Sequence, residues 1–135
     1  MTKENEKEKT EKPDLNLEVL EIDGRKYELY IGFAFVREID KLAPVKIEAM
    51  AYGSGVYMLV DGLAARSPIA LLHVIQAGTC TEKQKPSLKG IEKLIDDWFE
   101  AGVLEDVYKG FLDLLENRSM TAPVVRMIKK VAMTN

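Results

Sequence analysis

The strongest constraint on the fold is a stripe of apolar residues at helical spacing in the second half of the chain. Counted from the first, its members fall at i, i+3, i+4, i+7 and i+8: Ile91, Leu94, Ile95, Trp98 and Phe99. This spacing places all of these side chains on one face of an α-helix, with charged residues on the other face. We assign the aromatic residues of this stripe and of the next one to core packing: Trp98, Phe99, Tyr108 and Phe111.

Shorter stripes and helix-ending residues predict further helices along the chain. Ser67 before Pro68 is typical of a helix start, because the hydroxyl can cap the helix and proline suits its first position. Ser87 can cap the helix that carries the main stripe. Gly78 is well placed to end one helix, and Pro44 to end an earlier one. The predicted helices cover residues 35–42, 52–65, 69–77, 91–99, 104–117 and 121–131.

A β-hairpin is predicted ahead of these helices. Asp23-Gly24 suits a two-residue type I′ turn, because both residues tolerate positive φ angles. That turn sets two favourable cross-strand pairs, Glu21 with Lys26 and Leu20 with Tyr27. Leu17 and Val19 alternate in the opposite phase to Leu20. We therefore expect a bulge near Val19 or partial burial of both faces of the strand.

Together these signals predict a mostly α fold, in which an N-terminal β-hairpin precedes a compact bundle of five or six short helices. Residues 1–14 alternate acids and bases and hold too little apolar surface to fold, so we expect a flexible charged arm. Residues 15–135 then form a single helical domain, which suits a chain of 135 residues. Residues 45–50 are too few to decide between a linker, a strand and a short helix.

Composition argues against several classes of function. A net charge of −3 without a basic stripe argues against nucleic-acid binding. One cysteine, Cys80, and one histidine, His73, cannot supply a disulfide or a multi-residue metal site, so we expect no metal and no cofactor. Residues 1–13 lack the apolar core of a targeting signal, and no apolar run is long enough to span a membrane. We therefore expect a cytoplasmic protein without membrane contact.

The residue types that could carry catalysis all stand at positions that fit a non-catalytic role. His73 lies between apolar neighbours on a predicted helix and has no partner at a suggestive spacing. Cys80 is expected to be a free, unexceptional thiol in a loop. Asp96, Asp97 and Glu100 fall on the solvated side of an amphipathic helix. We therefore expect no catalytic residues and no enzymatic activity.

The least charged part of the chain, residues 49–81, holds only Asp61 and Arg66 as charged residues. Two interpretations of its apolar helix stay open. In the first, it forms a buried pair with the next helix at the centre of the domain. In the second, part of its surface binds an apolar segment of a partner, because large exposed apolar patches usually mark interaction sites. The residues of this candidate partner-binding surface are Val56, Tyr57, Leu59, Val60 and Leu63.

Two segments carry a resemblance to a known family. Residues 30–35, YIGFAF, run into VREID at residues 36–40, which is similar to an aromatic "FGxxFLRELD" segment. Residues 67–79, SPIALLHVIQAGT, are similar to "DPVALxxVIxAAT". Ser67 stands where the family usually has Asp and keeps a capping oxygen, and Gly78 replaces the second small Ala.

Lys85-Pro86-Ser87 and two acidic amphipathic helices complete the order of these features. Over residues 15–131, the chain resembles the small tail assembly chaperones of long-tailed bacteriophages, especially those of Gram-positive hosts. The resemblance implies that the chain binds the tape measure protein in the host cytoplasm and keeps it soluble. Tail tube subunits would polymerise around that protein, and the chaperone would then leave and be absent from the finished virion.

The resemblance also implies partners beyond the tape measure protein. Family members commonly have a longer frameshift product, whose extra C-terminal part recruits the tail tube protein. A coat of many copies implies self-association into an oligomer, with the helices after Ser87 as one candidate surface. The alternative function is that of a small acidic helical adaptor or regulator, which binds a host or phage protein in a stable stoichiometric complex.

Overall fold

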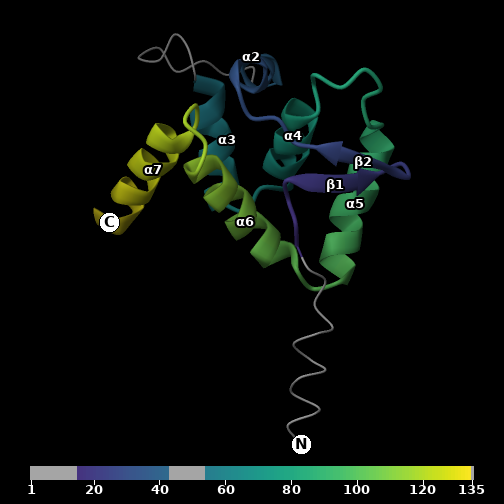
Figure 1. Cartoon of the computed structure of the whole chain (residues 1–135). Helices are drawn as coiled ribbons and strands as arrows, with labels where there is room; N and C mark the ends of the chain where they lie inside the picture. Colours follow the sequence, from purple (N-terminus) through teal and green to yellow (C-terminus); the bar gives the residue numbers. More distant parts are fainter. Residues whose placement is uncertain (1–14, 43–53, 135) are drawn as a thin grey trace, which may run out of the picture.

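The computed structural model describes residues 15–42 and 54–134, and this part of the chain is mostly helical (Figure 1). The elements, in chain order, are β1 (Val19–Ile22), β2 (Arg25–Glu28), α2 (Phe33–Leu42), α3 (Ser54–Ala64), α4 (Pro68–Gly78), α5 (Leu88–Glu100), α6 (Leu104–Glu116) and α7 (Ala122–Thr134). The predicted fold class is confirmed, since an antiparallel hairpin precedes six helices in this part. The predicted charged arm, Pro44 and residues 45–50 lie outside the described residues.

The hairpin forms around the predicted turn. Asp23 and Gly24 have φ angles of +56° and +75°, the left-handed values that a type I′ turn requires. Both predicted cross-strand pairs are present, Glu21 with Lys26 and Leu20 with Tyr27. Leu20 and Tyr27 are buried, so their face of the hairpin joins the hydrophobic core.

The change of phase ahead of β1 comes from a turn, and the expectation of a bulge near Val19 is wrong. The Leu29 N–H donates to the Glu18 carbonyl oxygen (2.8 Å), so the pairing continues past Val19 without an extra residue. A turn just before the strand resets the alternation, and in it the Glu18 N–H donates to Asn16 Oδ1 (3.1 Å). As a result, Leu17 is buried while Val19 remains 40% exposed.

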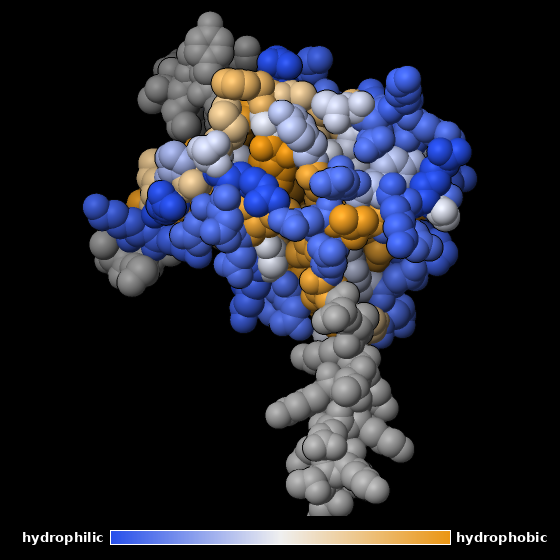
Figure 2. All heavy atoms as spheres, viewed as in Figure 1, coloured by the Kyte–Doolittle hydropathy of each residue, from blue (hydrophilic) through white to orange (hydrophobic). Residues whose placement is uncertain are grey.

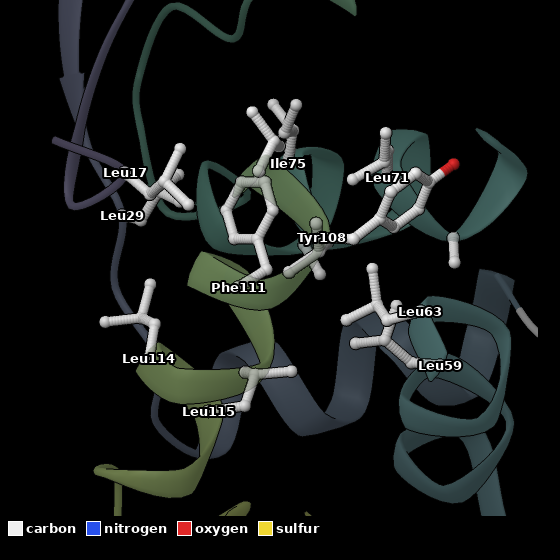
Figure 3. Packing of buried hydrophobic residues seen from close by; sticks show 14 of the residues in the cluster. Leu17, Leu29, Leu59, Leu63, Leu71, Ile75, Tyr108, Phe111, Leu114 and Leu115 are labelled. Carbon is white, nitrogen blue, oxygen red and sulfur yellow. The ribbon is translucent and has the colours of Figure 1, made fainter. Parts of the chain in front are cut away.

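Helix α3 lies within the helical bundle, packed against α2, α4, α6 and α7. Figure 3 shows the core beside it, where Tyr108 and Phe111 point from α6 toward Leu71 and Ile75 of α4. Leu63 of α3 belongs to the same cluster and is fully buried. The predicted burial of Tyr108 and Phe111 is confirmed.

The hairpin turn also holds the start of α5. The Asp23 carboxylate accepts hydrogen bonds from the Ser87 N–H (2.8 Å) and from the Ser87 hydroxyl (3.1 Å). The same hydroxyl accepts from the Gly90 N–H (2.9 Å), so Ser87 caps α5 as predicted. A Cβ at Gly90 would overlap with Asp23 Oδ1. The absence of a side chain at Gly90 therefore allows the turn to sit on the helix end.

Gly78 is the last residue of α4, as predicted, but its role there is a close approach. Its φ is not in the left-handed region. The Tyr30 N–H donates to the Gly78 carbonyl oxygen (2.9 Å), which ties the chain after β2 to the end of α4. A Cβ at Gly78 would lie 2.8 Å from Leu29 Cδ2. Glycine thus allows the hairpin and α4 to touch.

Helix α3 ends at an arginine in the left-handed conformation. Arg66 has a φ of +62°, and the Ser67 N–H donates to the Gly62 carbonyl oxygen (2.8 Å), which closes the last turn. The Arg66 guanidinium donates to both carboxylate oxygens of Glu105 on α6, each at 2.7 Å, and lies 5.7 Å from the Tyr108 ring centroid. This paired hydrogen bond raises the pKa of Arg66 and lowers that of Glu105. Arg66 therefore ties the turn between α3 and α4 to α6.

Candidate functional site

The residues predicted to bind a partner lie mostly inside the domain. Four of them are at most 4% exposed: Val56, Leu59, Val60 and Leu63. They pack in the core, as the interpretation of a buried helix pair predicted. Tyr57 is half-buried and lines a groove between α3 and α7. In this conformation Tyr57 is partly accessible to solvent, whereas the other four side chains are enclosed in the core.

The outer face of α3 carries small and apolar side chains around one acid. Its exposed residues, including the one just after the helix, are Met58, Asp61, Ala64 and Ala65. An open groove with a volume of about 420 Å³ runs between this face and α7. On α7 its wall consists of apolar side chains, Met127, Ile128 and Val131. Met127 is 43% exposed and Val131 55% exposed, so this groove presents apolar surface to solvent.

A second groove lies between α3 and α4, and its volume is about 260 Å³. Its lining includes Met58 and Asp61 from α3 and Ile69 and His73 from α4. Asp61 also lines the groove between α3 and α7, so the two grooves adjoin at this carboxylate.

A third groove lies between α4 and α5, with a volume of about 420 Å³. Its lining is Pro68, Ile69, Leu72, Glu92, Ile95 and Asp96. Ile69 is 56% exposed and lines both this groove and the one between α3 and α4. We call the three adjoining grooves the groove face; it extends from α7 across α3 and α4 to α5.

The charges of the groove face are all of one sign. The acids among its described lining residues are Asp61, Glu92 and Asp96, and no Lys or Arg is among them. The ion pairs found within the described part of the chain involve other carboxylates. Burial lowers the pKa of His73, which favours its neutral form near neutral pH. The groove face is therefore apolar with an acidic rim.

Three residues of the groove between α3 and α4 have the side-chain types of a hydrolase triad, Ser67, His73 and Asp61. Within the described residues, however, no hydrogen bond joins any two of these side chains. The Ser67 hydroxyl instead accepts from the Ala70 N–H (3.4 Å) at the start of α4. Nucleophilic catalysis needs the nucleophile in contact with its base, so the geometry here is that of a helix cap beside a half-buried histidine.

Cys80 and the acids of α5 were the other candidates for chemistry in the sequence, and their surroundings do not form a catalytic arrangement within the described residues. The Cys80 thiol donates to the Ala34 carbonyl oxygen (3.6 Å), and burial raises its pKa, which disfavours the reactive thiolate. Asp97 pairs with Lys93 (3.1 Å) one turn away on the exposed side of α5. Asp96 and Glu100 are exposed as predicted. No group of three or more potential metal ligands occurs in the part of the chain that the structure describes.

The assignment of Phe99 to the core is wrong. Trp98 is 7% exposed, but Phe99 is 65% exposed. The Trp98 ring meets the Phe111 ring edge to face, with the ring centroids 6.2 Å apart. At i+8 from Ile91, Phe99 lies at the far edge of the stripe and near the end of α5, where no neighbouring element covers it in the described structure.

On the side of the molecule that Figure 2 shows, hydrophobic areas in the middle are surrounded by hydrophilic side chains.

Sequence reasoning did not identify Met58 and Ile69 as surface residues of the groove face. Both belong to helices in which most of the other large apolar residues are buried. One signal was available for Ile69, because it directly follows Pro68 in the first turn of α4, and a helix end is often less covered than its middle. For Met58, the next residue Leu59 is buried, and the positions of the helices packed against α3 decide which of the two is exposed.

A comparison with known protein families matches most of the chain. A family model described as phage tail assembly chaperone protein, TAC, matches residues 19–130. No curated protein and no solved structure matches the chain. Among the described residues, none of the helices has the length and apolar character needed to cross a membrane.

Proposed function

The chain belongs to the phage tail assembly chaperone family, and from this membership we propose that it binds the tape measure protein of a long-tailed phage in the host cytoplasm. Binding would keep that protein soluble while tail tube subunits polymerise around it. The tube would then displace the chain, which is absent from the finished virion. The family itself suggests a non-enzymatic role in tail assembly.

The observation that carries the proposal is the groove face. It brings exposed apolar side chains from separate helices to one continuous set of grooves, among them Met58, Ile69 and Met127. An apolar segment of the client laid in these grooves would be removed from water, which stabilises the complex by roughly 25 cal/mol per Å² of buried apolar surface. Grooves of this kind are a common way of binding amphipathic helices.

Grooves that are open to solvent also suit a chaperone that must leave its client. Much of the gain from apolar burial is offset by lost translational and side-chain freedom, so each copy would bind the client only modestly. Many copies along one long client would still coat it, and self-association would strengthen the coat through multivalency. A longer frameshift product that recruits the tail tube protein would bring the displacing subunits to the same client.

Co-expression tests this proposal directly. The chain is expressed with the tape measure protein encoded in the same genome, and the soluble fraction and the co-purified material are measured. We expect the tape measure protein to be soluble and to co-purify only when the chain is present. Equal solubility with and without the chain would contradict the proposal, and a stable stoichiometric complex with another protein would favour an adaptor.

A pair of substitutions tests whether the groove face is the site. Ile69→Asp places a charge at the junction of two grooves, and an acid in the first turn of α4 favours the helix. We expect it to abolish co-purification of the tape measure protein while the circular dichroism spectrum stays unchanged. The matched control is Phe33→Asp, which changes a 68% exposed residue in the first turn of α2 outside the grooves. The control should bind normally, and equal loss in both variants would rule out the groove face.

A further inference from the structure

The charge of the groove face narrows the class of client segment that fits it. The chain as a whole has 19 Lys and Arg against 22 Asp and Glu, so an arbitrary part of its surface would carry both signs. The described lining of all three grooves instead combines apolar side chains with acids only, Asp61, Glu92 and Asp96. An acidic rim around an apolar floor matches a helix whose apolar stripe is bordered by cations.

Resting on the proposed function, we propose that the groove face selects amphipathic client helices whose apolar stripe is flanked by Lys or Arg. Asp61 lies where the grooves beside α7 and α4 adjoin, so a cation beside an apolar side chain in either groove can reach it. Glu92 and Asp96 are one turn apart on α5 and line one wall of the third groove. Lys and Arg fit these positions because their apolar stems can lie along the groove wall while their charged ends reach a carboxylate.

The three carboxylates are available to a partner. The ion pairs within the described residues use Glu18, Asp97, Glu105 and Glu116. A client cation at Asp61, Glu92 or Asp96 would therefore not have to displace a cation of the chain itself. A client helix flanked by acids would place like charges together, which is unfavourable. Selection would thus work by attraction of one class of helix and repulsion of the other.

Synthetic helices test the selection without the tape measure protein. Three labelled peptides of about 18 residues, or five helical turns, share one apolar stripe and differ only in the flanking residues, which are Lys and Arg, Gln, or Glu. Their affinity for the purified full-length chain is measured by fluorescence anisotropy. We expect the basic peptide to bind on the order of tenfold more tightly than the acidic one, because three exposed ion pairs each contribute modestly. The preference should shrink at about 0.5 M salt.

Two charge-matched triple variants locate the preference. Asp61→Asn, Glu92→Gln and Asp96→Asn together should reduce the preference to roughly twofold, because the attraction and the repulsion both lose their source. The control combines Glu28→Gln, Glu82→Gln and Glu100→Gln, which change exposed acids outside the grooves and alter the net charge equally. The control should keep the preference. If both triple variants lose it equally, net charge alone explains it and the proposal is wrong.

The remaining outcomes separate this proposal from the proposed function. If all three peptides bind equally, the grooves bind apolar helices without charge selection, and only this inference fails. If no peptide binds although the tape measure protein is kept soluble on co-expression, the groove face is not the client site, which overturns the inference and leaves the chaperone role. If a second copy of the chain occupies the grooves, sedimentation shows a dimer that the basic peptide does not dissociate, and the inference also fails.

Discussion

Helices α3 and α5 are both rich in apolar residues, but their surroundings differ. Helix α3 has neighbours in α2, α4, α6 and α7, whereas α5 has neighbours in α4, α6 and β1 and keeps a long side in solvent. The buried residues of α3 include Val60 and Leu63, both with no exposed surface, while at the end of α5 Phe99 is 65% exposed. The exposure of an apolar side chain therefore depends on how many elements surround its helix more than on how apolar the helix is.

The two helices accordingly have different tasks in the candidate site. Helix α3 supplies the centre of the groove face through its outer residues, and its large buried residues pack in the core. Helix α5 supplies acids and a half-buried Ile95 to one wall, and its outer side faces water. Substitutions in the buried part of α3 should therefore destabilise the fold most, and substitutions on the exposed side of α5 should destabilise it least.

The largest effect is expected from Val60→Asp on α3. Val60 has no exposed surface, so the variant would bury an unpaired carboxylate, at a cost of roughly 5 kcal/mol or more. This is a large share of the stability of an ordinary domain, about 5–15 kcal/mol. We expect loss of the cooperative thermal transition by circular dichroism. Tyr57→Asp, one turn earlier and half-buried, is the control and should retain most of the helical signal.

A folded Val60→Asp variant with normal melting would contradict the placement of α3 in the core. It would then favour the interpretation in which this face of α3 binds a partner.

Trp98→Ala on α5 is expected to have the next largest effect. The Trp98 side chain is 7% exposed and meets Phe111 of α6 edge to face, so its removal leaves a cavity between the two helices. Truncations of this kind cost about 3–5 kcal/mol. The free energy of unfolding in urea measures the loss. A loss below about 1 kcal/mol would mean that the packing between α5 and α6 is looser than this structure describes.

Much of the fold could be predicted because local signals and packing agree. The Asp23-Gly24 turn fixed the register, and the Ser67 and Ser87 caps marked the starts of α4 and α5. The positions of these elements could not be predicted in the same way. That Asp23 also holds Ser87, 64 residues later, depends on tertiary contacts that no local pattern shows.

The candidate site could be predicted only in part. The sequence indicated the apolar segment around α3 but not which of its residues reach the surface. Helical spacing resolves the faces of a helix that has one buried side, but α3 is covered from several directions, and its apolar residues occur all around it. The grooves arise between elements, and Met58 and Ile69 become neighbours in one groove only after α3 and α4 pack.

Gly55→Ala should weaken the contact between α2 and α3 by a smaller amount. A Cβ at Gly55 would lie 2.8 Å from backbone atoms of Ile39 and Asp40, and the Gly55 N–H donates to Asp40 Oδ1 (2.9 Å). Overpacking against backbone costs about 1–3 kcal/mol, and the better helix propensity of alanine offsets only about 0.5–1 kcal/mol of it. We expect a lower midpoint of urea unfolding.

Gly110→Ala is the matched control for this change. There the added Cβ would meet Leu17 Cδ1, the end of a flexible side chain that can rotate away. Its effect should therefore be smaller than that of Gly55→Ala. The opposite order would show that α2 and α3 are less closely packed than the structure indicates.

A small pH dependence should come from His73 at the groove between α3 and α4. Burial lowers its pKa in the folded chain, so the unfolded chain binds the proton more readily. Stability is thus fully present above the unfolded pKa of about 6.5 and falls as the pH drops from there toward the lower folded pKa. The difference in melting temperature between neutral and mildly acidic buffer should be smaller in His73→Gln. An unchanged difference would assign the pH dependence to other groups.

The smallest effect is expected from Phe99→Ala, which completes the contrast with α3. Phe99 is adjacent to Trp98 but is 65% exposed, so its truncation should change the free energy of unfolding by no more than about 0.5 kcal/mol. Binding of helical peptides should also be unchanged, because Phe99 does not line the groove face. The contrary result would be a clear loss of stability in Phe99→Ala, and a loss that increases with protein concentration. It would mean that a second copy covers the open side of α5, and the difference between α3 and α5 would then hold only for the isolated chain.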